Sequence, residues 1–372
     1  MCAVAILAVS TKANAQAPKP PATGLEAVVG VYQGTVDARR GKAPIACELR
    51  LANGKVTGTL QPGDDALAVT GASLAGNTLT LNLDINGNDV PLTGNFKDGH
   101  FEGSVMGATL VMTKVDPHAA AVVSAPPPNT SEADKAAVKQ AAYDYAEGGF
   151  EGAADRMERA VHPALVKRGL LPFGRAFVLS PMNAEMLIEG ARAGGGRDVP
   201  ADQRNISFEA LDIRDNVATA RIFTSQFNDY LHLVKMDGKW RLANVLWQPP
   251  SQQGVANAEA DKAAIAQVFT AYFDTIRAGD AAAFERLIHP DAALRSFKAA
   301  PSTRWVIAEN NRESDVERVR QKRMPIAIVP TVTVLDVYDN IASVLLTSAS
   351  NIRYCHLARQ NGRWRIVNML SR

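Results

Sequence analysis

The chain has 372 residues, of which 47% are hydrophobic and 21% are charged. This length predicts two or three domains, and the composition predicts packed cores rather than a disordered chain. Forty basic and 38 acidic residues leave a formal net charge of only +2. Because the chain lacks the strongly basic footprint of nucleic-acid-binding proteins, we expect no nucleic-acid partner.

The N-terminal residues have the pattern of an export signal. A short apolar run from Ala3 to Val9 is followed by Ala13-Asn14-Ala15, which matches the A-x-A pattern of signal cleavage sites. No basic residue precedes the apolar run, so we expect an N-terminally truncated signal peptide at residues 1–15 and a periplasmic or secreted protein. No run approaches the ~18 apolar residues of a membrane-spanning helix, so we expect no membrane anchor.

Residues 24–115 have the pattern of an all-β domain. Alternating runs such as 78–83 are separated by turn pairs, among them Asn53-Gly54. Asn and Gly tolerate the positive φ angles that tight hairpins need. We therefore expect a small all-β barrel or sandwich, and Gly30-x-Tyr32-x-Gly34 resembles the opening strand of calycin-like barrels.

The rest of the chain contains the same domain twice. Glu132-Ala133-Asp134-Lys135 returns 127 residues later as Glu259-Ala260-Asp261-Lys262, and Gly238-Lys239-Trp240-Arg241 returns 124 residues later as Gly362-Arg363-Trp364-Arg365. The two copies span residues 132–249 and 259–372, after a Pro- and Ala-rich linker at 116–131. A unit of this length is a whole duplicated domain and not a solenoid repeat.

Within each copy, helical patterns come first and strands follow. The second copy begins with an apolar stripe of helical period that includes Phe269 and Phe273, and the first copy keeps this stripe with smaller side chains such as Ala142. Ser180-Pro181 predicts the start of a third helix. The back half of each copy alternates as strands do, so the pattern predicts an α+β domain.

Three segments of each copy resemble the nuclear transport factor 2-like superfamily, in its putative lumazine-binding branch. They are His162-Pro163 after the second helix, the strand Asp229-Tyr230-Leu231-His232-Leu233, and the ending Asp237 to Asn244. The second copy departs from the first by having Arg353 where the first has Asp229. The resemblance implies two tandem cone-shaped domains that pair through their sheets as an internal pseudo-dimer, and the branch implies a heteroaromatic ligand.

Two tyrosine–histidine pairs are the candidate ligand-binding residues. Tyr230 and His232 are two apart on one predicted strand and share a face, as do Tyr354 and His356. Together with His162 or His289 they could hydrogen-bond a planar polar ligand in a cavity, or act as acid and base near neutral pH. The alternative is that these side chains satisfy hydrogen bonds inside a core. For His162 and His289, an interaction with the C-terminal end of a helix is a further alternative.

We predict an exported, non-catalytic protein that binds a small molecule. One alternative is an isomerase or hydrolase that uses a pocket histidine as base, and another is a protein-interaction module with filled cones. No catalytic residue is assigned, because the positions of the carboxylate base in ketosteroid-isomerase-type enzymes correspond to Arg168-Gly169 and Arg295-Ser296. No metal site and no cofactor are expected, since the chain has no metal-ligand spacing and no phosphate-binding glycine loop.

Overall fold

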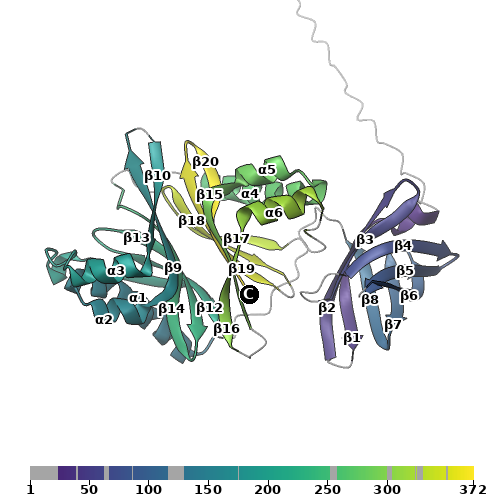
Figure 1. Ribbon diagram of the computed structural model, residues 1–372, viewed down its shortest axis with the longest axis horizontal. Helices are drawn as coiled ribbons and strands as arrows, with labels where there is room; N and C mark the ends of the chain where they lie inside the picture. The colour runs from purple at the N-terminus through teal and green to yellow at the C-terminus, as the bar shows by residue number, and fades with distance from the viewer. Residues whose placement is uncertain are drawn as a thin grey trace, which may run out of the picture.

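The computed structural model describes residues 24–38, 41–62, 67–85, 87–115, 130–174, 176–251, 258–299, 304–322, 324, 330–348 and 351–372. The expected export signal at 1–15 lies outside these residues, and so does most of the expected linker at 116–131. The described residues form a β-barrel followed by two domains of helices and strands (Figure 1). The predicted order, an all-β module and then two α+β domains, is confirmed. No described helix is long and apolar enough to cross a membrane.

The N-terminal module is a closed barrel, because its first strand pairs with both the second and the eighth. A 3₁₀ helix precedes the strands, and the elements are η1 (Gly24–Val28), β1 (Gly30–Ala38), β2 (Gly41–Ala52), β3 (Lys55–Pro62), β4 (Leu67–Ala75), β5 (Thr78–Ile85), β6 (Asn88–Lys97), β7 (His100–Val105) and β8 (Ala108–Val115). Alternation buries Leu79, Leu81 and Leu83 of β5 in the barrel interior. Gly34 lies where β1 meets β8, and a Cβ atom there would be 1.7 Å from the carbonyl oxygen of Val111, so only glycine fits.

The two repeats have the same order of helices and strands. The first contains α1 (Glu132–Glu151), α2 (Ala154–Ala160), β9 (Val161–Phe173), β10 (Ala176–Asn183), α3 (Ala184–Arg192), η2 (Ala201–Gln203), β11 (Ser207–Arg214), β12 (Val217–Phe223), β13 (Asn228–Met236) and β14 (Lys239–Gln248). The second contains α4 (Ala258–Ala278), α5 (Ala281–Leu287), β15 (Ile288–Ala299), β16 (Trp305–Asn310), α6 (Arg312–Arg320), β17 (Thr331–Tyr338), β18 (Ile341–Thr347), β19 (Ile352–Gln360) and β20 (Arg363–Ser371). Their sheets have the equivalent orders β10-β9-β14-β13-β12-β11 and β16-β15-β20-β19-β18-β17.

The segment after the second helix differs from the sequence prediction. It forms strand β9, which lies parallel to β14 and antiparallel to β10. Ser180-Pro181 is part of β10, and α3 begins only after Asn183, whose side chain accepts a hydrogen bond of 2.9 Å from the backbone N–H of Met186. Proline is tolerated within β10 because this strand is at the edge of the sheet.

Each sheet buries one face under its own helices. In the first repeat Leu231 and Leu233 of β13 pack with Val138 and Ala142 of α1, and the second repeat has the equivalent core around Leu357. We call the interior between a sheet and its helices the cone of that repeat.

The opposite faces of the two sheets pack against each other. Two further apolar clusters contain residues of both repeats, for example Val234 with Leu345 and Leu246 with Val367. Figure 1 shows the sheets side by side between the two sets of helices. Both faces of the central strands are therefore covered, and every residue of β18 is buried.

Polar contacts across this interface come in pairs related by the repeat. The Tyr230 hydroxyl donates to Asp336 at 2.9 Å, and the Tyr354 hydroxyl donates to the equivalent Asp212 at 2.7 Å. Arg221 also donates to Asp336, at 2.6 Å. This reciprocity is the property of a two-fold symmetric dimer interface, here within one chain.

Asp336 provides a test of the interface. Replacement by alanine leaves the Tyr230 hydroxyl without its acceptor and removes an ion pair from Arg221, which is about one-third exposed. We expect Asp336→Ala to lower the free energy of unfolding by about 2 kcal/mol. Chemical denaturation of the full chain measures this, with Glu158→Ala, at an exposed position of α2, as the control. Equal stability of the two variants would show that the pair contributes nothing.

Candidate functional site

The four side chains of the repeated Tyr-x-His pattern lie between the two sheets. The rings of His232 and His356 stack with their centroids 3.5 Å apart. Each histidine also stands beside the tyrosine of the other repeat, with Tyr354 6.0 Å from His232 and Tyr230 6.1 Å from His356. The solvent-exposed fraction of all four residues is 0%. The structure thus brings the two predicted pairs together, but in the interface and not inside a cone.

Strand alternation explains why this location differs from the predicted one. Leu231 and Leu233 point to the helices, so Tyr230 and His232 point to the sister sheet. The side chains on both faces of this strand are buried. Alternation in the sequence therefore assigns the residues to two faces, but it does not determine which face lines the cone. The expectation that Tyr230, His232 and their counterparts surround a cavity is corrected accordingly.

The stacked histidines are neutral hydrogen-bond acceptors. The Asn244 side-chain amide donates to Nδ1 of His232 at 3.3 Å, and Asn368 donates to Nδ1 of His356 at 3.2 Å. Burial lowers the pKa of His232 to about 3. Burial, with the neighbouring His232, holds the pKa of His356 well below its ordinary value. A role as acid and base near neutral pH is therefore not supported for this pair.

His162 and His289 have equivalent places at the ends of α2 and α5. Nδ1 of His162 accepts a hydrogen bond of 3.0 Å from the backbone N–H of Ala164, and Nδ1 of His289 accepts one of 3.1 Å from that of Asp291. Both rings therefore close the turn around the following proline, and they accept from an N–H rather than donate to helix carbonyls. Burial and the nearby Arg295 lower the pKa of His162 to about 4.

A surface hollow of about 410 Å³ adjoins His162. It is lined by His162, Pro163, Met236, Asp237, Lys239 and Arg241. Among the contacts between described residues, none joins His162 or His289 to the stacked pair. The six predicted residues therefore do not form one site.

The first cone contains a cavity of about 220 Å³ that is distinct from the sites predicted from the sequence. Its walls are mainly aromatic, aliphatic and glycine residues from α1, α3 and the loops after α3 and β12. Half of the Met186 surface is exposed, so the cavity opens toward solvent beside α3. The residues lining it are Tyr145, Gly149, Phe150, Met157, Lys167, Met182, Met186, Leu187, Gly190, Ala191, Gly195, Gly196, Gln226 and Phe227.

A buried trio of polar side chains borders this cavity. Lys167 of β9 donates through Nζ to the hydroxyl of Tyr145 on α1 and to Oδ2 of Asp229 on β13, the latter at 3.3 Å. The Tyr145 hydroxyl donates to the same Oδ2 at 2.5 Å. Nζ also lies about 5 Å from three ring centroids: Tyr145 at 5.0 Å, Phe227 at 5.4 Å and Trp247 at 4.9 Å.

Burial governs the electrostatics of the trio. Burial lowers the pKa of the Lys167 ammonium, and the charge of Asp229 counteracts this shift. Burial raises the pKa of the Asp229 carboxyl, and the charge of Lys167 counteracts this shift. Burial also raises the pKa of the Tyr145 hydroxyl well above its ordinary value. Oδ1 of Asp229 and Nε1 of Trp247 are buried without a hydrogen-bond partner among the described residues. The trio thus has unused hydrogen-bonding capacity, which is a feature of functional sites.

The second cone has a different interior. Leu294 occupies the position of Lys167, and Arg353 occupies that of Asp229. Larger side chains fill the space: Phe273 stands where the first repeat has Ala146, Ile276 where it has Gly149, and Phe284 where it has Met157. Among the described residues, the second cone therefore has larger side chains at positions that line the cavity of the first.

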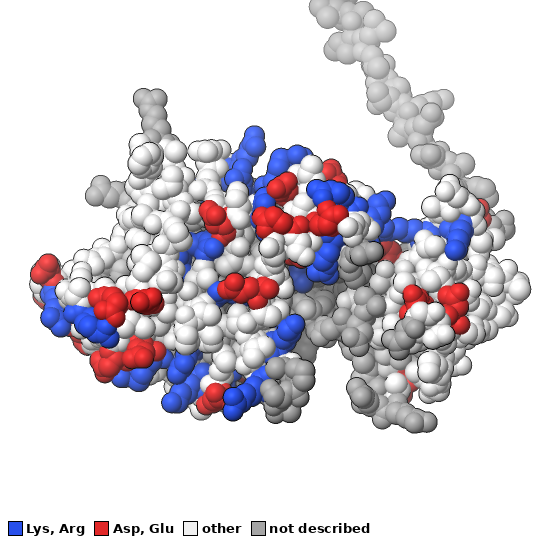
Figure 2. Space-filling model, viewed as in Figure 1, with Lys and Arg blue, Asp and Glu red and all other residues white. Residues whose placement is uncertain are grey.

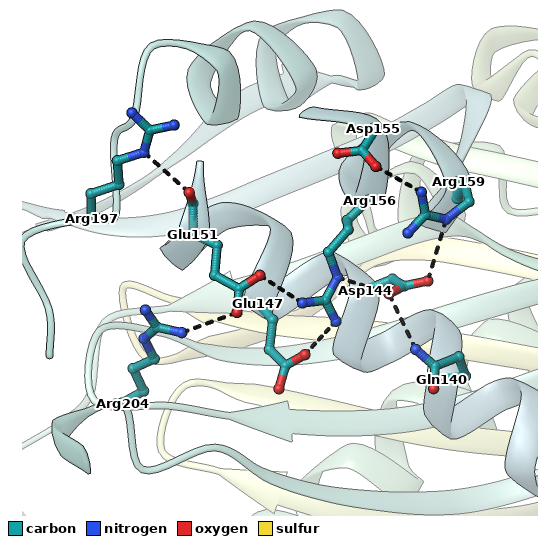
Figure 3. A network of polar contacts seen from close by, with 9 residues as sticks. All are labelled: Gln140, Asp144, Glu147, Glu151, Asp155, Arg156, Arg159, Arg197 and Arg204. Carbon is teal, nitrogen blue, oxygen red and sulfur yellow. Dashed lines mark hydrogen bonds and ion pairs between the residues drawn. The ribbon is translucent and has the colours of Figure 1, made fainter. Parts of the chain in front are cut away.

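Ion pairs hold the wall of the first cavity in place (Figure 3). Arg156 of α2 reaches Glu147 and also Asp144 of α1 at 3.0 Å and Glu151 at 2.7 Å. The guanidinium of Arg197, next to the cavity-lining Gly196, donates to the backbone oxygen of Glu151 at 3.1 Å. These contacts tie the end of α1, which supplies Gly149 and Phe150, to the loop opposite it.

The sequence contained a signal for this site. A lysine within the apolar segment Leu165-Val166-Lys167 stands opposite a leucine in the second copy, and Asp229 stands opposite an arginine. Because residues 161–173 were not predicted to be a strand, nothing placed Lys167 on the same sheet as Asp229. Within the described residues, no group of three or more His, Cys, Asp or Glu side chains has the arrangement of a metal site.

Charge is evenly distributed on the face seen in Figure 2. Basic and acidic side chains alternate over the helices and the strands of both repeats, and no large area of one sign appears in this view. This face therefore offers no extended electrostatic surface for a highly charged partner.

Comparison with known proteins supports the duplication. The model of the family described as putative lumazine-binding matches residues 133–248 and again residues 260–370. No curated protein matches the chain.

Solved structures of nuclear transport factor 2-like proteins of unknown function are similar to about one-third of the chain. The protein from Silicibacter pomeroyi has 13% identity and a TM-score of 0.26, and the match covers 32% of this chain and 99% of that one. The protein from Methylobacillus flagellatus has 22% identity and a TM-score of 0.26 over 33% of this chain and 97% of that one. The protein from Shewanella baltica has 22% identity and a TM-score of 0.27, and the match covers 33% of this chain and 100% of that one.

The stacked histidines predict a pH dependence of stability. Because the pKa of His232 is about 3 in the folded chain and ordinarily 6.5, only the unfolded chain takes up a proton as the pH falls below 6.5. The contribution of the neutral ring is complete above pH 6.5, and at pH 5 about 2 kcal/mol of it is lost. His356 acts in the same direction.

Urea denaturation at pH 8 and pH 5 tests this expectation. The double variant His232→Phe/His356→Phe should lose clearly less stability between the two pH values than the wild type, although His162 retains part of the dependence through its own lowered pKa. An equal loss in both proteins would mean that the stacked pair does not cause the dependence.

Proposed function

This chain belongs to the family described as putative lumazine-binding, and on that premise we propose that it is an exported protein that binds a small heteroaromatic molecule in the cone of its first repeat. The observation that carries the proposal is the cavity of about 220 Å³ bordered by Lys167 and Tyr145. The second repeat supports the first as its packing partner.

The size and walls of the cavity suit a molecule of one or two rings. A cavity of roughly 150 Å³ in another protein takes up benzene, so 220 Å³ leaves room for a larger planar group. Phe150, Met157 and Leu187 offer apolar surface to ring faces. Lys167 and Tyr145, which line the cavity, are the polar groups that can hydrogen-bond a ring nitrogen or carbonyl oxygen.

Binding is favoured over catalysis by a pocket histidine, because the histidines that this alternative requires lie elsewhere. His232 and His356 are packed between the sheets, and His162 and His289 hold backbone turns. The larger side chains among the described residues of the second cone favour an interaction role for that repeat alone.

Export is proposed from the apolar run Ala3–Val9 and the Ala13-Asn14-Ala15 pattern. The measurement is N-terminal sequencing of the protein recovered from cell fractions. A mature N-terminus at Gln16 in the periplasmic or culture fraction supports export, and an intact N-terminus in the cytoplasmic fraction opposes it.

Filling the first cone should abolish binding. In Gly149→Ile the first cone receives the side chain that Ile276 provides in the second. A Cβ atom at Gly149 would meet only the Met157 side chain, at 3.7 Å, so the helix tolerates the change while the side chain enters the cavity. We expect a fluorescence titration with lumazine to show saturable binding to the wild type and none to this variant.

A matched pair of tyrosine variants tests the polar trio. Tyr145 and Tyr272 are equivalent in the two repeats. Tyr145→Phe should weaken binding of lumazine by about 5- to 100-fold, because it removes a hydrogen-bonding group at the cavity. Tyr272→Phe should leave the affinity unchanged. No binding to the wild type, or equal binding to Gly149→Ile, would refute the proposed site.

A further inference from the structure

Lys167 is an unusual residue for the interior of this fold. It is only 5% exposed, and its amine lies among aromatic rings at the edge of a cavity. Leu294 occupies the same place in the second repeat and packs there as a core residue. The fold therefore does not need a lysine at this position. Burying an ammonium group carries a large desolvation cost, so the first repeat retains an unfavourable group at its cavity.

The neighbours of the amine provide a route for its proton. Nζ contacts both the Tyr145 hydroxyl and Oδ2 of Asp229, and these two contact each other. Burial lowers the pKa of Lys167 and raises the pKa of Asp229, so both shifts favour a neutral amine beside a neutral carboxylic acid. A buried lysine in this state is a nucleophile, whereas an exposed lysine is protonated at neutral pH.

We propose that Lys167 captures a small aromatic aldehyde or ketone in the first cone as a covalent imine. This inference rests on the proposed function, because it assigns the class of ligand to the same cavity. The supporting geometry is a buried amine at the cavity wall, a hydroxyl and a carboxyl group within hydrogen-bonding reach, and walls that accept one aromatic ring.

The chemistry balances without a further reagent. The Lys167 nitrogen attacks the carbonyl carbon, and the carbonyl oxygen receives a proton through Tyr145 and Asp229. The carbon–oxygen double bond breaks, a carbon–nitrogen double bond forms, and the oxygen leaves as water with the two hydrogens of the amine. When the imine takes up a proton, the Asp229 carboxylate is its counter-ion.

The test uses 4-hydroxybenzaldehyde as the probe and the full chain. The conjugated imine is followed by its absorbance, which requires no reductant. In a parallel sample cyanoborohydride delivers hydride to the imine carbon, and peptide mapping locates the resulting secondary amine. Lys139, on the exposed side of α1, serves as the internal reference.

We expect one probe per chain on Lys167 at neutral pH, formed at least about tenfold faster than on Lys139, because the cavity holds the aromatic probe beside the amine and burial, by lowering the pKa of Lys167, enlarges its neutral fraction. Lys167→Met should remove both the absorbance change and this label. Gly149→Ile keeps the lysine but fills the cavity, so it should suppress labelling of Lys167 and leave that of Lys139 unchanged. Tyr145→Phe should slow imine formation by about 100-fold through loss of proton transfer.

The outcomes separate this inference from the proposed function. Labelling spread over exposed lysines, with Lys167 unmodified and no absorbance change, overturns the imine. If lumazine still binds the wild type and not Gly149→Ile, only the covalent inference fails. If lumazine binding is also absent or insensitive to Gly149→Ile, both proposals fail.

Discussion

Burial of both faces of each six-stranded sheet is the constraint on which the rest of the two repeats depends. One face of a sheet packs under its helices, and the other packs against the sister sheet. Partners across the shared face therefore stabilise its polar groups, since an unpaired buried group is costly, although Nε2 of His232 and of His356 has no partner among the described residues. Tyr230 with Asp336, Tyr354 with Asp212, and Thr219 with Ser343 at 3.1 Å are such partners.

Duplication allowed the two cones to differ while the interface stayed reciprocal. Phe273, Ile276 and Phe284 fill the second cone, whereas Ala146, Gly149 and Met157 leave space in the first. A cavity destabilises a core in proportion to its volume, and a buried lysine adds a desolvation cost. The first repeat therefore carries two features that lower its stability and that suit a binding site.

The family, the fold class and the repeat were predictable because they depend on patterns that the chain repeats. His-Pro returns after 127 residues, and Tyr-x-His and the Gly-x-Trp ending both return after 124. The helical stripe of α4 is long enough to be recognised. Strand β9 was not predicted, because the segment Val161–Phe173 contains Pro163 and Pro172 and lacks a strict alternation of polar and apolar residues. Without β9, Lys167 had no place in the predicted architecture.

The sequence by itself determined that this chain contains a duplicated α+β domain, which residues are equivalent in the two copies, and where Lys167 and Asp229 depart from Leu294 and Arg353. Only the tertiary structure decided that the Tyr-x-His face meets the sister sheet and that Lys167 meets Tyr145 and Asp229. The physical reason is that alternation assigns side chains to two faces of a strand, whereas the packing of sheets and helices around the strand decides what each face contacts.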